Sequence, residues 1–582
     1  MAWLCYKSLL TGALTEGLHD HDESPADDGK SPGVPRPRAR KGRVTMDTET
    51  PLAAPPAAAG RTKPALAFSD TDSAKRWAKT LPLASVSQVY DAVMGQLHAV
   101  SAADFAPRER ATIAEVLREP VAHLHTELAR RFAGKPQPPG EREQDAYEQA
   151  SALWGGLWEQ YSACLKPLLE GDPDLAGVKA KLLQRGLYVG KQLLLVNGLA
   201  RRVAPPALWQ ELHAYYRLAE MLDCAVTAVS DDMTPHAVGV SCYSTYSHAL
   251  LLGLADPCAM TVRQIELTDR WLAQWARKVF PYAQQRETEG PVIVCDLDSA
   301  FGATLTDSVP RETTASMRFG YPGKLATSVR GRLKRLSTGA NPAELQLGHD
   351  TYVEQCSTLL AHLDHRWYQV PRRNAARPRT TLEVCGGGLV AAYFRVGGRT
   401  FDRQDPLGRL TFHGTQHLQT LGALTDYDRF KEEAERNFPW ERWQGRCEWH
   451  EASVARAAPW HHKWFLEQLC AVRDDERTRL GYVTRVGFDP GGEFALSLKL
   501  WPGVPKTLAV RPLTHAFSED PPLPLIHLGE TPEDKPSLVV PPRTFSPGRL
   551  LRSMDSGPER TFRLTRLIQR GADFERVAFD ES

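Results

Sequence analysis

The 582-residue chain lacks several features that would place it in a familiar class. No run of about 20 uninterrupted apolar residues occurs, so the sequence predicts no membrane-spanning helix. Its 10 cysteines contain no C-x-x-C pair, which argues against metal ribbons and thioredoxin-type redox centres and indicates a reducing, cytoplasmic location. Lys and Arg total 71 against 70 Asp and Glu, and this net charge of +1 argues against broad electrostatic binding to nucleic acid or to anionic membranes.

Signatures of the common catalytic classes are missing as well. The chain has no Walker A motif, no G-x-S-x-G and no H-E-x-x-H. The run Gly386-Gly387-Gly388 is not followed by Lys-Ser/Thr, so we expect a turn or bulge there rather than a phosphate loop. The adjacent histidines His461 and His462 come without a third metal ligand in view. The sequence therefore predicts a protein that is not an enzyme and uses no metal or other cofactor.

What the chain contains is an ordinary globular balance, with 42% hydrophobic and 24% charged residues. At roughly 150 residues per domain, its length suggests about three or four domains. The beginning differs, because its acidic and basic patches and its Pro/Ala run cannot bury enough apolar surface to offset the entropy cost of ordering. Met46 is a plausible alternative start to Met1. We divide the chain into a disordered leader (1–68), a helical domain (69–282), a small α/β segment (283–371) and a C-terminal β-barrel with a helical insertion (372–582).

The helical domain shows the spacing expected of packed amphipathic helices. Thr261 and Gln264 have capping-box spacing, and Leu267, Trp271 and Trp275 follow on one helix face. We interpret such aromatic residues as helix–helix core. Antiparallel helix pairs are favoured over a repeat array, because no tetratricopeptide-like period recurs along the chain.

Beyond residue 379 the pattern changes to short strands separated by turn signals, which is typical of a barrel or a sandwich. Several runs alternate apolar and polar residues, and Asp489-Pro-Gly-Gly predicts a hairpin turn. The segment Asp426–Asn437 has the pattern of a helix inserted into this region. The predicted strands are Thr380–Val384, Leu389–Phe394, Cys447–Ser453, Leu480–Val486, Phe494–Lys499, Thr507–Arg511, Ser537–Val540, Phe562–Leu567 and Phe574–Phe579.

Arginines are concentrated just before the first of these strands, at Arg372, Arg373, Arg377 and Arg379. The spacing Arg373-x-x-x-Arg377 resembles the R-x-x-x-R entry motif of PilZ domains, which are small β-barrels, many of which bind cyclic di-GMP. Guanidinium groups suit that ligand, because they can bind guanine O6 and N7, stack on the base and pair with phosphate. The alternative interpretation is a solvated basic loop.

The second PilZ motif, [DN]-x-S-x-x-G, has a partial counterpart at a predicted strand end. Ser453 is kept, Glu451 stands in for Asp or Asn, and Arg456 stands where Gly is expected. Glu451 is one methylene longer than Asp, and Arg456 brings a Cβ and a cationic side chain where Gly would allow close backbone approach. Together with its helical first half, the chain resembles large proteobacterial PilZ-containing proteins over roughly residues 70–580.

The resemblance implies an α+β multidomain fold, in which a helical N-terminal domain is followed by a small α/β segment and a C-terminal PilZ-like β-barrel. It also implies a non-catalytic, cytoplasmic regulatory or adaptor protein of cyclic di-GMP signalling type, with a protein partner bound through the helical domain. If cyclic di-GMP is bound, Arg373 and Arg377 would clamp guanine and phosphate. Ser453 and Glu451 would then contact the base or position the arginines.

Two other functions remain open at this point. The degenerate second motif favours a ligand-free interaction scaffold, in which the helices bind a partner and the barrel is structural. From another class, Asp296-Leu-Asp298 after a short apolar run resembles the D-x-D motif of haloacid dehalogenase-type phosphatases, with Asp296 as nucleophile and Asp298 as acid/base beside Mg²⁺. Ala300 replaces the Thr or Val expected there, and polar residues that end a buried strand are the simpler interpretation.

Overall fold

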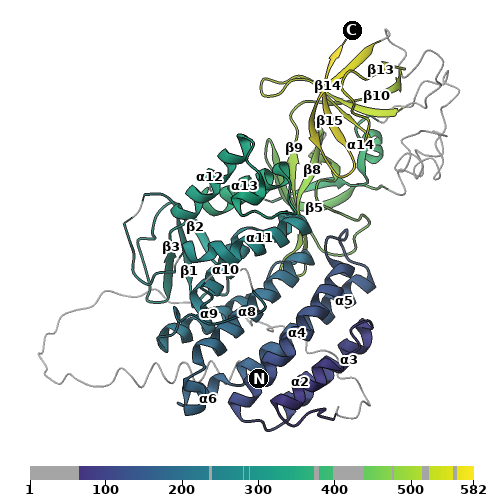
Figure 1. The fold of residues 1–582 in the computed structure, drawn as a ribbon. Coiled ribbons are helices and arrows are strands. Elements are labelled where there is room, and N and C mark those ends of the chain that lie inside the picture. The colour runs from purple at the N-terminus through teal and green to yellow at the C-terminus, as the bar shows by residue number, and fades with distance from the viewer. Residues whose placement is uncertain are drawn as a thin grey trace, which may run out of the picture.

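The computed structural model of the chain describes residues 65–234, 239–279, 281–287, 289–371, 379–397, 438–474, 477–513, 523–554 and 560–581. Within these ranges a helical N-terminal part is followed by a small three-stranded sheet and then by two closed six-stranded barrels (Figure 1). The first barrel lies between the helices and the second barrel. The predicted α+β multidomain fold, helical first and barrel-forming last, is confirmed. The predicted insertion at Asp426–Asn437 and residues 1–64 of the predicted leader lie outside the described residues.

The N-terminal part is built around helix α8, which is buried on almost every side because α5, α9 and α10 pack against it. Two glycines allow this close packing: a Cβ at Gly186 would come within 1.9 Å of the Tyr215 ring, and one at Gly190 within 2.5 Å of the Trp158 ring. The capping box predicted at Thr261 is present at the beginning of α11. None of the described helices is both long and apolar enough to cross a membrane. The helices are α2 (Thr71–Lys79), α3 (Val86–Ala102), α4 (Pro107–Phe132), α5 (Glu141–Ser162), α6 (Leu165–Leu169), α7 (Pro173–Ala176), α8 (Lys179–Leu199), α9 (Pro206–Met221), α10 (Cys242–Leu254) and α11 (Val262–Trp275).

A small antiparallel sheet with strand order β2-β1-β3 follows, together with two helices. Two indole N–H groups tie this segment to the N-terminal helices. Trp367 donates to the carbonyl of Leu251 at 2.9 Å, and Trp271 donates to the carbonyl of Leu347 at 3.0 Å. One hydrophobic core therefore runs from the helices into the small α/β segment. Its elements are β1 (Val292–Asp296), β2 (Thr304–Thr306), β3 (Met317–Gly320), α12 (Gly323–Ser337) and α13 (Val353–Tyr368).

The strands beyond residue 379 form two closed barrels, where the sequence had predicted one. The first closes in the order β4-β5-β6-β9-β8-β7 and the second in the order β10-β11-β12-β15-β14-β13. Each barrel has its own apolar interior, and closure removes exposed strand edges. The first barrel comprises β4 (Thr380–Cys385), β5 (Glu441–Cys447), β6 (Glu451–Arg456), β7 (Leu469–Asp474), β8 (Arg477–Phe488) and β9 (Phe494–Leu500). The second comprises β10 (Pro505–Pro512), β11 (Leu523–Leu528), β12 (Ser537–Val540), β13 (Leu550–Ser553), β14 (Thr561–Arg570) and β15 (Glu575–Glu581).

The segment Leu389–Phe394, which was predicted as a strand, instead belongs to helix α14 (Gly388–Gly397) between the two barrels. The helix packs in one apolar cluster with Leu469 of the first barrel and Ile526 of the second. A short run that is apolar on every side suits either a buried strand or a buried helix, and periodicity alone does not decide between them. The predicted strand Cys447–Ser453 is also wrong in part, because it contains the turn between β5 and β6.

The first barrel docks on the helical part through backbone and side-chain contacts. A short antiparallel bridge pairs Gln137 with Trp464. On β8, the Nε of Arg485 is 3.2 Å from both carboxylate oxygens of Asp256. Asp256 immediately precedes the short helix η1 (Pro257–Ala259), which joins α10 to α11. The barrel is thus fixed against the connection between these two helices.

Candidate functional site

The described part of the predicted ligand motif lies on the outer face of the first barrel. Arg373 and Arg377 lie outside the described residues, which resume at Arg379, one residue before β4. Glu451 and Ser453 lie on β6 with exposed side chains, whereas the residues that alternate with them are buried. Because successive side chains of a strand point to opposite faces, both motif residues face away from the barrel interior.

The strand register brings the beginning of β4 close to Ser453. Thr380 on β4 is opposite Gly445 on β5, and the next residue of β5, Arg446, is opposite Ser453 on β6. Neighbouring strands lie about 4.8 Å apart, so the beginning of β4 and Ser453 are separated by about 10 Å. The beginning of β4, which is distant from Ser453 in the sequence, therefore lies about two strands away from it in the first barrel.

This surface carries three cations that have no partner among the described residues. The side chains of Arg379, Arg446 and Lys499 are exposed and make no hydrogen bond or ion pair with any described residue. Lys499 on β9 is opposite Glu451 in the strand register. Three cations against one carboxylate leave a positive surface that can attract a phosphate-bearing ligand. The sequence alone does not indicate Arg446 and Lys499 as site residues, because only strand pairing brings them beside the motif residues.

Arg456, which replaces the Gly of the second motif, is engaged inside the barrel. Its NH1 is 3.8 Å from Oε2 of Glu441, a carboxylate whose side chain is fully buried. The other oxygen of Glu441 accepts a hydrogen bond from the backbone N–H of His461 at 2.7 Å. A buried carboxylate is costly unless it is paired and hydrogen-bonded. The departure from the motif at Arg456 therefore has a structural explanation.

The alternative phosphatase motif is not assembled into a site. Asp296 ends β1, the middle strand of the antiparallel sheet, and its Oδ1 accepts the backbone N–H of Asp298 at 3.0 Å. A hydrogen bond from Arg217 lowers the pKa of Asp298, so its carboxylate is ionised and paired with the guanidinium group. In the ranges that the structure describes, no three His, Cys, Asp or Glu side chains are grouped as metal ligands would be. These contacts explain both aspartates as structural residues.

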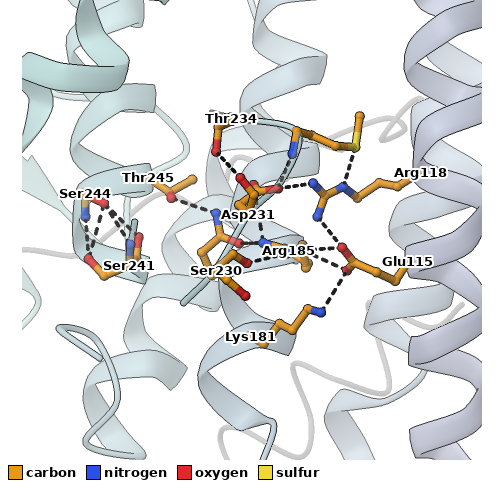
Figure 2. A network of polar contacts seen from close by, with 12 residues as sticks. Glu115, Arg118, Lys181, Arg185, Ser230, Asp231, Thr234, Ser241, Ser244 and Thr245 are labelled. Carbon is orange, nitrogen blue, oxygen red and sulfur yellow. Dashed lines mark hydrogen bonds and ion pairs between the residues drawn. The ribbon is translucent and has the colours of Figure 1, made fainter. Parts of the chain in front are cut away.

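A polar network that the sequence did not reveal lies in the helical part (Figure 2). Arg118 on α4 and Arg185 on α8 both contact the carboxylate of Asp231, in the loop that follows α9. Glu115 completes the network, with 2.8 Å contacts to NH1 of Arg118 and to Nε of Arg185. The two arginine side chains are 1% and 2% exposed, so their charges depend on this pairing. The network holds the loop against two helices. No local sequence motif predicts it, because its members come from three separate elements.

Beside this network lies a cavity of about 200 Å³, bounded by α8, α10, α11 and the same loop. Nζ of Lys191 is 3.0 Å from Oδ1 of Asp269, and Nε2 of His248 is 2.8 Å from the same oxygen. Burial lowers the pKa of His248, so the imidazole is neutral near pH 7. Burial opposes ionisation of Asp269, but Lys191 and the neighbouring imidazole outweigh it and hold the pKa of that carboxyl well below its usual range. The cavity therefore contains an ionised acid beside a buried cation.

Comparison with known proteins identifies a similarity to cyclic di-GMP receptors. Residues 72–282 match the family model described as "Cyclic-di-GMP receptor FimW, N-terminal domain". The chain is also similar to the cyclic-di-GMP receptor FimW of Pseudomonas aeruginosa (strain PAO1), with 24% identity over 332 residues. That alignment covers 56% of this chain and 54% of the relative, so the chain spans about half the length of the curated relative that it matches. No solved structure matches the chain. The helical part that contains the Asp269 cavity is thus the part that is similar to a receptor's N-terminal domain.

Proposed function

We propose that this protein is a non-catalytic regulatory protein of cyclic di-GMP signalling and binds the dinucleotide on the outer face of its first barrel. The observation that carries the proposal is the match of residues 72–282 to the N-terminal domain of a cyclic di-GMP receptor. The PilZ-like spacing of Arg373 and Arg377, directly before a barrel strand, supports it. The exposed cations on the neighbouring strands, which have no partner in the described ranges, support it as well.

In the proposed complex, Arg373 and Arg377 supply the main contacts to the ligand. Arg377 precedes Thr380 by three residues, so the chain itself keeps it within about 10 Å of the beginning of β4. The guanidinium groups would bind guanine O6 and N7 and pair with the phosphates. Ser453 and Glu451, about two strands away, would contact the base or position the arginines.

The ligand would act on a protein partner through the helical part. The barrel that carries the proposed site also contacts the helices through Arg485 and Asp256, so a change at the barrel surface has a direct route to them. A helical part shifted between two arrangements would present an altered surface to its partner. We place this activity in the cytoplasm, since the cysteines among the described residues are free thiols, as in a reducing compartment.

Calorimetric titration of cyclic di-GMP into the full chain tests the proposal. We expect micromolar or tighter binding, and an affinity at least about 100-fold lower in Arg373→Ala/Arg377→Ala, because two charge-assisted hydrogen-bonding groups are removed. The matched control is Arg131→Ala/Arg142→Ala, which removes two exposed arginines from α4 and α5. Binding that persists in the first double variant, or is lost in the control, would refute the assignment of the site.

A second candidate function is the ligand-free interaction scaffold, and the internal ion pair of Arg456 with Glu441 favours it. That pair fills the position where a PilZ site needs a glycine for close ligand approach. A scaffold predicts no heat with cyclic di-GMP at any ligand concentration. It also predicts that a partner captured by the full chain stays bound to the same extent whether the dinucleotide is present or absent.

A further inference from the structure

The cavity between α8, α10 and α11 has no role in the barrel site and has the size of a small ring system. Its volume is about 200 Å³. A dry cavity of about 150 Å³ is known to hold benzene, so a one- or two-ring heterocycle fits here while a complete cyclic dinucleotide does not. Solvent reaches the cavity, because the side chains of Asp269 and Arg270 in its wall are 29% and 35% exposed.

The charges in the wall favour a neutral but strongly hydrogen-bonding ligand. Lys191 and Asp269 form a close pair, so the innermost charges cancel. A phosphate inside the cavity would meet the carboxylate, and an organic cation would meet the ammonium group. A neutral ring with both donors and acceptors on its edge meets neither penalty.

The polar atoms are arranged as a donor beside an acceptor. The ammonium of Lys191 lies 3.0 Å from the carboxylate of Asp269, and both residues line the cavity. His248 is buried, and its Nε2 is 2.8 Å from Oδ1 of Asp269, so the neutral imidazole donates a hydrogen bond to that carboxylate. The ring of Tyr188 adds an aromatic wall with Lys191 Nζ 5.2 Å from its centroid. The site therefore holds an acceptor, a donor and an aromatic surface.

Guanine has the edge that complements this arrangement. Its O6 is an acceptor next to the N1–H and N2–H donors, so O6 can face Lys191 while both N–H groups face the carboxylate of Asp269. Adenine offers only one donor group on the same edge, so it can satisfy the carboxylate less completely.

A partly exposed guanidinium group at the open side of the cavity can bind the phosphate of a nucleotide. Arg270 lines the cavity and shares the carboxylate of Asp350 with Arg263. Arg263 is also 3.4 Å from Oε2 of Glu266, so the two guanidinium groups are balanced by two carboxylates, and all of these side chains are partly exposed. A base inside the cavity would leave its phosphate near the guanidinium group of Arg270.

We propose that the helical part holds a second nucleotide site, in which Asp269 and Lys191 bind a single guanine base and Arg270 faces the phosphate. The choice of a guanine ligand rests on the proposed function, whereas the position and size of the site do not. The same base is found in a free mononucleotide and in each half of cyclic di-GMP. The experiment therefore uses GMP and cyclic di-GMP as separate probes.

Two variants of the full chain test the site by different means. Asp269→Asn removes the acceptor of the two N–H groups. Because it also leaves Lys191 without a charge partner, Ala273→Leu serves as the second variant, since it fills the cavity wall without changing any charge. Asp145→Asn, at an exposed position of α5 without a side-chain partner among the described residues, is the matched control. Circular dichroism melting checks that each variant is folded.

Calorimetric titration with GMP, AMP and cyclic di-GMP gives the readout. We expect GMP to bind at least 10-fold more tightly than AMP. Asp269→Asn and Ala273→Leu should each weaken GMP at least 10-fold, while the control and Arg373→Ala/Arg377→Ala bind GMP as the unmodified chain does. GMP binding that depends on Asp269 in a chain that ignores cyclic di-GMP would support the cavity site and overturn the proposed function.

The opposite result separates the two proposals as clearly. If cyclic di-GMP binds and requires Arg373 and Arg377, but both cavity variants leave its affinity and stoichiometry unchanged and GMP gives no heat, the cavity site is overturned and the proposed function stands. No heat with any of the nucleotides overturns both.

Discussion

Between the two barrels, the carboxyl group of Asp573 has a strongly raised pKa. This side chain lies just before β15, and its Oδ1 accepts the backbone N–H of Leu469 on β7 at 2.8 Å. Its other oxygen lies against the first residue of α14, Gly388, where a Cβ would come within 2.8 Å of it and where φ is +74°. A carboxyl group is thus held between both barrels and the helix that packs between them. We predict that Asp573→Asn stabilises the protein at alkaline pH and has little effect in acid.

The magnitude follows from the pKa of the buried acid. Burial raises the pKa of Asp573 from 3.8 to about 7, against the opposing effect of the Leu469 N–H. Below about pH 4 the group is neutral in both the folded and the unfolded chain. As the pH rises from about 4 to about 7, only the unfolded chain gains free energy by ionising, so folding stability falls over this window. Three pKa units correspond to at most about 4 kcal/mol, and asparagine, which stays neutral while its oxygen accepts the same N–H, avoids this loss.

Urea unfolding of the full chain at pH 4.5 and at pH 8 measures this difference. The signal is tryptophan fluorescence, since Trp501 lies in the same apolar cluster as Leu469. We expect Asp573→Asn to be more stable than the unmodified chain by only about 1 kcal/mol at pH 4.5, where the carboxyl of the unfolded chain has begun to ionise, and by up to about 4 kcal/mol at pH 8. Hydrogen exchange of the peptide that contains Leu469 assigns the effect to the junction between the barrels. The control Asp145→Asn replaces an exposed carboxylate and should leave the unfolding midpoint unchanged at both pH values.

One result would refute the reasoning directly. A carboxylate near the beginning of a helix is stabilised by the N-terminal end of the helix dipole, and this effect at α14 opposes the burial of Asp573. If the dipole outweighed burial, Asp573 would be ionised in the folded protein at neutral pH. Asp573→Asn would then be less stable than the unmodified chain at pH 8, with the difference disappearing in acid.

Two further predictions concern packing and docking in the helical part. Gly186→Ala places a methyl group 1.9 Å from the Tyr215 ring and should lower the free energy of unfolding by about 1–3 kcal/mol. At Gly155 a Cβ would meet nothing within 4 Å, so Gly155→Ala should raise the free energy of unfolding by up to about 1 kcal/mol. Thermal unfolding measures both variants, and equal shifts would contradict the packing argument. Arg485→Ala leaves the half-buried carboxylate of Asp256 without its barrel partner and should cost about 1–3 kcal/mol of docking. Faster hydrogen exchange confined to β8 and to the residues around Asp256 is the expected signature, and unchanged exchange there would show that the ion pair contributes nothing to docking.

The sequence predicted the parts of this fold that local patterns determine. The helix beginning at Thr261 has a side-chain cap that its spacing announces, and the strand Ser537–Val540 is found with the same bounds. The number of barrels was not predictable in this way, because closure depends on which strands pair and not on where each strand lies. The segment Leu389–Phe394 was predicted as a strand for a similar reason: it is apolar on every side, and only the two barrels that enclose it determine that it is helical.

The candidate sites likewise include residues that local patterns predict and residues that only the tertiary fold brings together. The motif residues Glu451 and Ser453 could be named from spacing and resemblance, and the structure places both on one exposed face, whereas Arg373 and Arg377 remain predictions. The cations Arg446 and Lys499 are contributed by strands that only the tertiary fold places beside them. The helical cavity had no sequence signal at all, since its donors and acceptors come one from each of three helices.

The two proposed sites are connected by one short element. Asp269 and His248 lie near the middle of α11 and α10, so a ligand in the cavity touches both helices at once. Those helices are joined by η1, and Asp256 immediately before it is the residue that Arg485 of the barrel contacts. A change in the spacing of α10 and α11 therefore requires η1 to move, and η1 lies next to the contact between Asp256 and the barrel. Packed interfaces adopt discrete arrangements and not a continuous range of them. Occupation of either site would therefore favour one arrangement of the barrel on the helices. The effects of the two ligands would combine at this docking contact.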